Sequence, residues 1–183
     1  MKMHSLSGNF LVASPGLNDP HFSQTVVLMC DHTDAGAFGI VINRVITNSF
    51  HSLLSRFDLE KGPVDMPVYY GGPVQPEQGY IIYAPYRRKY GSLRIAKNIG
   101  VSSSRELLQD ILNGKGPADY LFSLGHSGWS SNQLEEELMT DSWLVVPMAE
   151  EIVFSAKPAE RWRSAAGLIG IDFHRFFERS GNA

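Results

Sequence analysis

The sequence predicts an α+β fold: a single domain built on a mixed, strongly curved or barrel-like sheet that is flanked by helices. Strand-forming segments gather in the first half of the 183-residue chain, and helical segments come mostly later, without the strand–helix alternation of a doubly wound sheet. The number of strands, about eight or nine, favours a sheet that bends or closes. No repeat and no Pro/Gly/Ser-rich linker interrupts the chain, so we expect one domain over residues 1–183.

The first half is predicted to consist of strands with one short helix. Apolar and β-branched runs predict strands over residues 9–13, 25–30, 38–43, 68–70, 80–83 and 92–95. The stretch 31–36 between two of these strands has the composition of a loop. Apolar residues recur at helical spacing from Phe50 to Phe57, so a helix is expected over residues 49–56.

The second half mixes helices with strands. Ser103 followed by Glu106 matches a capping box and predicts the start of a helix with one apolar face. Asn132 repeats this N-cap pattern for a second helix, and Pro158 occupies the favoured first position of a third. Strands are expected over residues 119–124, 143–146 and 152–154.

Composition limits the classes of function. The net charge of −3 argues against direct nucleic-acid binding, which relies on a positive surface. The single cysteine, Cys30, excludes an internal disulfide and is typical of a reducing compartment. No apolar run reaches the roughly 7–15 residues of a secretory signal or the roughly 20 residues of a membrane span. We therefore expect a cytoplasmic protein that does not associate with a membrane.

Several motifs follow one another in a fixed order along nearly the whole chain. They are Phe10-Leu11-Val12-Ala13-Ser14-Pro15, Asp19-Pro20-His21-Phe22, the run from Val26 to His32, the run from Gly36 to Asn43, Gly71-Gly72-Pro73-Val74, Leu124-Gly125, Gly128-Trp129, Gln133-Leu134-Glu135, Trp143-Leu144, Arg161-Trp162 and Leu168-Ile169-Gly170. In this order they resemble the signature of the YqgE/AlgH family.

The resemblance implies a mixed α+β domain whose sheet curls towards a barrel. It also implies a bacterial cytoplasmic protein, and some members of the family are labelled transcriptional regulators, but the family supplies no biochemical activity. The sequence departs from the family pattern at Val45, where many relatives have proline, at Tyr83, where histidine is common, and at His126-Ser127, where a Tyr-Ala pair is usual. A role for these departing residues would not be a family role.

The stretch Gly125-His126-Ser127-Gly128-Trp129 is a candidate nucleophile elbow. It follows a predicted strand and precedes a predicted helix, and Asp141 and His174 complete the hydrolase order of serine, acid and histidine. However, Trp129 replaces the second glycine that the sharp turn of this motif requires. The favoured interpretation is therefore a loop that leads into a helix, with a catalytic Ser127 as the alternative.

A second candidate site combines Cys30 and His32 with Asn43, Gly71 and Gly72. Cys30 and His32 alternate along a predicted strand, so they are expected on the same face as a thiolate–imidazole pair or as two ligands. Four-ligand zinc spacing is absent from the sequence, so no metal is predicted. A buried core cysteine and glycines needed for turns and close packing are the favoured interpretation. No phosphate-loop or dinucleotide motif occurs, and no cofactor is predicted.

Charge is distributed unevenly along the chain. Residues 134–160 hold seven acidic side chains against one basic side chain, Lys157. Residues 78–105 hold no acid and six basic side chains: Arg87, Arg88, Lys89, Arg94, Lys97 and Arg105. Two solvated faces are the favoured interpretation. The alternative is that complementary patches meet, within the fold or between the protomers of a homo-oligomer, or that one patch receives a charged partner.

The basic segment also contains a candidate anion site. Ser102-Ser103-Ser104-Arg105 opens a predicted helix, and the free N–H groups of a helix N-terminus attract anions. Ser103, together with the side chains of Arg94, Lys97 and Arg105, is predicted to form a pocket for a phosphate-bearing or other anionic ligand. Capping of the helix by serine alone is the competing interpretation.

These observations support three hypotheses of function. The leading one is a non-catalytic regulatory or interaction module, without catalytic residues, that binds an unknown protein or a small anionic ligand. The second is a small hydrolase or thiol-dependent enzyme that uses Ser127 or Cys30. The third is a transcriptional regulator that binds DNA directly, which the negative net charge and the absence of a helix-turn-helix pattern disfavour.

Overall fold

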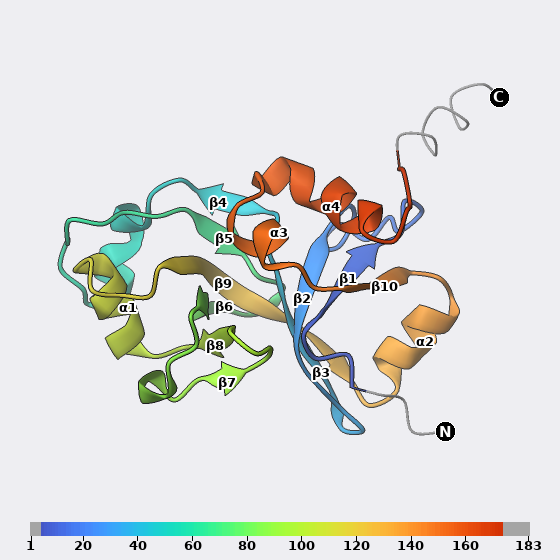
Figure 1. The fold of residues 1–183 in the computed structure, drawn as a ribbon, viewed down its shortest axis with the longest axis horizontal. Helices are drawn as coiled ribbons and strands as arrows, with labels where there is room; N and C mark the ends of the chain where they lie inside the picture. The colour runs from blue at the N-terminus through green and yellow to red at the C-terminus, as the bar shows by residue number, and fades with distance from the viewer. Residues whose placement is uncertain (1–4, 174–183) are drawn as a thin grey trace.

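The strands of the protein join in one curled sheet, which the computed structural model describes over residues 5–173 (Figure 1). Its strands are β1 (Asn9–Ala13), β2 (Val26–Thr33), β3 (Gly36–Val41), β4 (Val45–Thr47), β5 (Val68–Tyr70), β6 (Val74–Ala84), β7 (Leu93–Arg94), β8 (Gly100–Ser102), β9 (Asp119–Ser130) and β10 (Trp143–Pro147). Their order is β10-β1-β2-β3-β9-β6-β8-β7, and β4 joins through β5, which pairs with β9.

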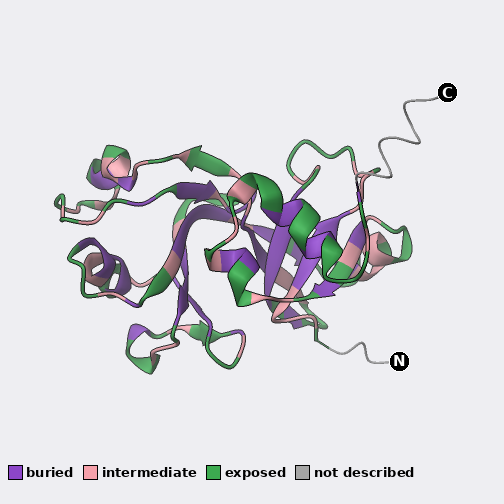
Figure 2. Ribbon diagram, turned by 45° about the horizontal axis from the view of Figure 1, so that its top comes forward, coloured by how far each residue is buried: buried purple, intermediate pink, exposed green. Residues whose placement is uncertain are grey.

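The helices lie on the flanks of this sheet. They are the 3-10 helices η1 (Phe50–Phe57) and η2 (Arg88–Tyr90) and the α-helices α1 (Arg105–Leu112), α2 (Gln133–Met139), α3 (Glu150–Phe154) and α4 (Pro158–Gly167). Figure 2 shows that the central strands are largely buried, whereas the helices keep exposed faces. The predicted α+β class, with a mixed and strongly curved sheet flanked by helices, is confirmed.

The long strand β9 links the two halves of the sheet. Its first part, up to Leu124, pairs with β5 in parallel and with β6 antiparallel, and its last part, from Ser127 to Ser130, pairs with β3. Between these parts Gly125 has a φ of 72°, a left-handed conformation that glycine adopts without strain. The strand can therefore change direction here, and the sheet curls around it (Figure 1).

The two halves of the sheet are covered differently. In residues 50–124, which we call the α1 lobe, η1 and α1 cover one face, and the buried side chains include Phe50, Ile81, Leu107 and Phe122. In residues 5–43 and 127–173, which we call the α4 lobe, helices cover both faces. Ile152 of α3 and Trp162 of α4 pack on one face, and Leu134 of α2 packs on the other with Trp129 and Trp143.

Most predicted elements are present, but one changes type and one grows. Residues 152–154, predicted as a strand, belong to helix α3 instead. A run of three apolar residues fits either structure, and Glu150 and Glu151 in the first turn favour a helix. The strand predicted over residues 119–124 continues to Ser130. The loop predicted over 31–36 is shorter, because β2 extends to Thr33 and β3 begins at Gly36.

The helix starts follow the predictions with one correction. The residue that caps α1 is Ser104 rather than Ser103: its Oγ accepts a hydrogen bond from the backbone N–H of Leu107 at 3.3 Å. Asn132 holds the N-cap position of α2, but with a φ of 63° and without a side-chain capping bond. Pro158 begins α4 as expected, and the helix predicted over residues 49–56 is the 3-10 helix η1.

Candidate functional site

Cys30 and His32 point to opposite faces of the sheet, so the predicted same-face pair is wrong. The register of β2 against β3 shifts between Met29 and Asp31, and this irregularity breaks the simple alternation of side chains. Cys30 packs in the core beneath α3 and α4, and burial raises the pKa of its thiol far above the ordinary value, helped by the nearby Asp31. A thiol that stays protonated is a poor nucleophile.

His32 instead connects β2 with α2 and with the start of the described chain. Its Nδ1 accepts a hydrogen bond from the backbone N–H of Leu6 at 3.2 Å, which places the ring proton of the neutral form on Nε2. That nitrogen lies 3.0 Å from Oε1 of Glu135. Both ring nitrogens are therefore used in structural contacts.

Asn43, Gly71 and Gly72 also make structural contacts. Asn43 accepts from the backbone N–H of Val26 and donates to the carbonyl of Gln24, both at 2.9 Å. A Cβ atom at Gly71 would lie 2.2 Å from the carbonyl oxygen of Gly125, and one at Gly72 would lie 2.3 Å from backbone atoms of His126. These glycines thus allow the segment before β6 to pack directly on the backbone of β9.

Ser127 lies inside β9, which overturns both the elbow hypothesis and the favoured loop interpretation. The elbow requires a sharp turn between a strand and a helix, whereas Ser127 pairs with Gly39 across the sheet. Its side chain is fully buried and donates to the carbonyl of Gly71 at 3.2 Å. Asp141 accepts a hydrogen bond from Ser14 through its backbone carbonyl, and His174 lies outside the described residues.

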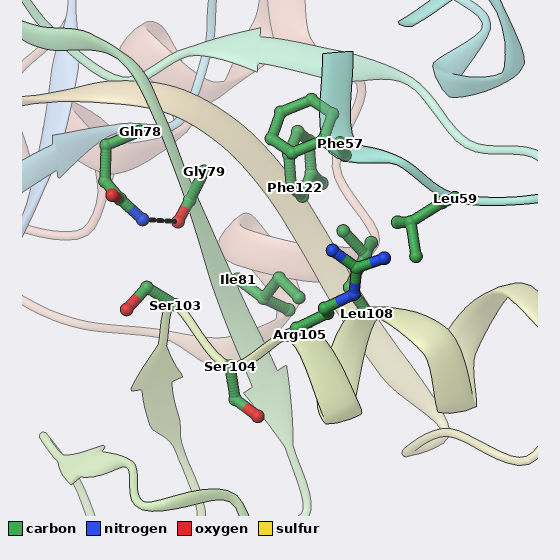
Figure 3. A pocket seen from close by; sticks show the side chains of 10 residues that line it. All are labelled: Phe57, Leu59, Gln78, Gly79, Ile81, Ser103, Ser104, Arg105, Leu108 and Phe122. Atoms are coloured by element: carbon green, nitrogen blue, oxygen red, sulfur yellow. Dashed lines mark hydrogen bonds between the residues drawn. The ribbon is translucent and has the colours of Figure 1, made fainter. Parts of the chain in front are cut away.

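The four predicted anion ligands divide into two groups. Ser103 and Arg105 line one pocket beside the start of α1 (Figure 3). Arg94 is engaged nearby instead: its guanidinium donates to the carbonyls of Ala96 and Lys97 and lies 5.3 Å from the ring centre of Tyr86. Lys97 is exposed and is not among the residues that line this pocket.

The pocket beside α1 combines an apolar floor with a polar rim. Its volume is about 130 Å³. The floor consists of Phe57, Leu59, Ile81, Leu108 and Phe122, and the rim consists of Gln78, Gly79, Ser103, Ser104 and Arg105. Figure 3 shows that the residues come from η1 and the segment after it, from β6, from the start of α1 and from β9. The apolar residues come from segments that are distant in sequence, so local sequence patterns predict only part of the rim.

Aromatic packing sets the shape of the floor. The rings of Phe57 and Phe122 meet edge to face, with centres 5.8 Å apart. Gly79 leaves room for this arrangement, since a Cβ atom there would lie 2.8 Å from the ring of Phe122. Gly79 follows the register irregularity in β6 and pairs with Leu124, and the sequence alone does not distinguish it from other strand glycines.

Arg105 supplies the positive charge at the rim. Its guanidinium donates to the backbone carbonyl of Asp58 at 2.5 Å, which fixes the side chain beside Leu59 without neutralising its charge. Within residues 5–173, no ion pair joins Arg105 to a carboxylate. The pocket can therefore bind an apolar group on its floor and an anionic group at its rim.

The basic and acidic segments are not joined by an ion pair in the part of the chain that the structure describes. Lys89 of η2 instead pairs with two acids of α1, with Asp110 at 2.8 Å and with Glu106 at 3.9 Å. In the acidic segment, Glu137 accepts hydrogen bonds from the indole N–H groups of Trp129 and Trp143, both at 2.8 Å. Each segment therefore has local structural partners.

Comparison with known proteins gives matches over the full chain. The family model DUF179, described as AlgH-like, matches residues 10–174. A UPF0301 protein from Dechloromonas aromatica is 40% identical over 182 residues, which cover 98% of each chain. The solution structure of the AlgH protein from Pseudomonas aeruginosa superimposes with a TM-score of 0.80 at 34% identity, over all of both chains.

A more distant structure has the same fold. A protein from Corynebacterium diphtheriae, 18% identical, superimposes with a TM-score of 0.70 over 89% of this chain and 86% of that one. The helices of residues 5–173 are all too short or too polar to cross a membrane.

Proposed function

This chain belongs to the AlgH-like family DUF179, and on that premise we propose that it is a non-catalytic interaction module that binds a small amphipathic anion. The proposed site is the pocket beside α1. The observation that carries the proposal is the placement of Arg105, a cation without an acidic partner among the described residues, at the rim of an apolar floor. Ligand binding there would regulate contacts with a protein partner.

The size of the pocket limits the ligand. A cavity of about 150 Å³ lined by apolar side chains accepts benzene, and the volume here is about 130 Å³. A six-membered ring or a branched chain of similar size therefore fits the floor, where it would contact Phe57 and Phe122. The larger part of the ligand would extend past the rim.

The charge of the ligand follows from the rim. The guanidinium of Arg105 offers several N–H donors in one plane, a geometry that suits a carboxylate or a phosphate. Ser103 adds an exposed hydroxyl on the same rim. An aromatic or branched carboxylate is therefore the simplest ligand that uses both parts of the site.

The two enzyme hypotheses have less support. The hydroxyl of Ser127 is buried and donates to a backbone carbonyl, and the buried thiol of Cys30 has a raised pKa. Neither side chain has the exposure and the adjacent base that nucleophilic catalysis requires. Direct DNA binding is also disfavoured, because Lys89 in the basic segment is already paired with Asp110 and Glu106.

Binding of benzoate tests the proposal. We expect benzoate to bind the full chain with a Kd of about 1 mM or tighter, and benzyl alcohol, which keeps the ring and lacks the charge, to bind about tenfold more weakly. In Arg105→Gln this preference for benzoate should disappear. In the control variant Arg88→Gln, which removes an exposed charge of η2 outside the pocket, the preference should remain.

Two results would overturn the proposal. One is the absence of benzoate binding at about 10 mM by calorimetry and by NMR. The other is an equal loss of binding in Arg105→Gln and Arg88→Gln, which would indicate a general effect of surface charge. A hydrolytic or thiol-dependent turnover that Ser127→Ala or Cys30→Ala abolished would overturn the non-catalytic part.

A further inference from the structure

A second pocket lies where α3 and α4 of the α4 lobe meet β5 and β9 of the α1 lobe. It has a volume of about 340 Å³, within the range of small-molecule sites. Tyr69 of β5, Leu121 of β9 and Phe154 of α3 form apolar walls. The charged residues that line it are Arg161 of α4 and two acids, Asp65 and Asp119, the latter at the start of β9.

Arg161 is buried, with 3% of its surface exposed, yet its hydrogen-bond partners are neutral. Its Nε donates to the carbonyl of Ala156 at 3.0 Å, and its Nη1 donates to the carbonyl of Ile42. The guanidinium carbon lies 5.2 Å from the ring centre of Tyr69. No ion pair joins Arg161 to a carboxylate within residues 5–173.

A buried guanidinium without a counter-charge is costly. Removing a cation from water costs several kcal/mol, and neutral carbonyls replace this hydration only in part. In agreement, burial lowers the pKa of Arg161, and its contact with Tyr69 opposes that shift. A carboxylate bound in the pocket would supply the missing charge to a side chain whose position is already fixed.

The negative charges of the two acidic residues in this pocket restrict the chemistry of the ligand further. Asp65 is occupied: its carboxylate accepts from Ser49 and from the backbone N–H groups of His51 and Met66. Asp119 is exposed. A simple anion would be repelled by Asp119, whereas a ligand that also carries an ammonium group would be attracted.

We propose that this pocket binds a small zwitterion, an amino acid with an apolar side chain. Its carboxylate contacts Arg161, its ammonium group contacts Asp119, and its side chain packs between Leu121 and Phe154. The site is separate from the pocket beside α1 and does not depend on the function proposed for it.

Leucine and two of its analogues provide the test. Isopentylamine keeps the side chain and the ammonium group but lacks the carboxylate, and 4-methylpentanoate lacks the ammonium group. Calorimetry with the full chain should show leucine binding about tenfold more tightly than either analogue. Asp119→Asn should remove the preference for leucine over 4-methylpentanoate, because the amide no longer attracts the ammonium group.

The choice of variant keeps the test informative. Arg161→Gln would remove bonds to Ile42 and Ala156 and can prevent folding, whereas Asp119 is exposed and its replacement leaves these bonds intact. Arg105→Gln should leave leucine binding unchanged, which separates this site from the pocket beside α1. The proposal is overturned if leucine does not bind, if isopentylamine binds equally well, or if Asp119→Asn leaves the preference unchanged.

Discussion

The α4 lobe and the α1 lobe bury parts of the same sheet in different ways. In the α4 lobe, buried apolar side chains pack together and also make specific hydrogen bonds. One of these runs from the indole N–H of Trp162 to the carbonyl of Ala13, at 2.8 Å. In the α1 lobe, the cover consists of the 3-10 helix η1 and the eight-residue helix α1, and the space left between them is the pocket of Figure 3.

The difference has a consequence for stability and for binding. Where side chains interlock and polar groups are paired, as around Trp162, little room is left for a ligand, and the second pocket lies at the border with β5 and β9 instead. A face covered by short helices leaves a partly open apolar floor that a ligand can complete. We therefore expect substitutions around Trp162 to act mainly on the free energy of unfolding, and substitutions at the pocket beside α1 to act mainly on ligand binding.

The largest effect is expected for Trp162→Ala. This side chain is buried against Ala165, Phe173 and the sheet, and removal of a buried tryptophan lowers the free energy of unfolding by about 3–5 kcal/mol. Urea unfolding followed by circular dichroism measures it. The matched change in the other lobe, Phe57→Ala, removes a half-buried ring from the pocket wall and should cost about 1 kcal/mol. Equal costs in the two variants would contradict the comparison.

A smaller effect on stability, with a clear effect on binding, is expected for Gly79→Ala. The added methyl group would lie 2.8 Å from the ring of Phe122, and because both residues line the pocket, the change alters the shape of its floor. Overpacking of this kind typically costs about 1–3 kcal/mol. Benzoate binding should be lost while the variant remains folded. Unchanged benzoate affinity in a folded Gly79→Ala would show that the floor of the pocket is not used.

Within the α4 lobe, the sequence predicts some features and misses others. Pro158 and the apolar residues that follow it give α4 directly, because capping and periodicity are local properties. The register shift in β2 between Met29 and Asp31 depends on its pairing with β3, so no local sequence pattern predicts it. The same holds for Ser127, whose place inside β9 depends on a distant partner strand.

The candidate site was predicted in part for the same reason. Ser103 and Arg105 were found because a helix start has a recognisable sequence, even though the capping residue is Ser104. Phe57 and Phe122 were not found, because their contact joins η1 to β9 across the fold. The sequence predicts Arg161 only as part of a family motif, because an arginine in an amphipathic helix is usually exposed. In the structure this arginine is buried.

The smallest effect is expected at the outer surface of the α1 lobe, for Asp110→Asn. Hydrogen bonds from Lys89 and Tyr90 lower the pKa of Asp110 below its ordinary value. A group with a lowered pKa in the folded state stabilises the protein above its ordinary pKa of about 4, and this contribution is lost as the pH falls through the folded-state value.

Asp110→Asn should therefore be slightly less stable than the parent protein at pH 7, and the difference should shrink as the pH falls through the folded-state pKa of Asp110. Urea unfolding at a series of pH values measures the difference, and 1 M salt should reduce it at pH 7 because the Lys89 side chain is exposed to solvent. A difference that persists at low pH would mean that Asp110 acts through packing rather than through its charge. The outer face of α1 would then contribute to stability by packing, as the region around Trp162 does.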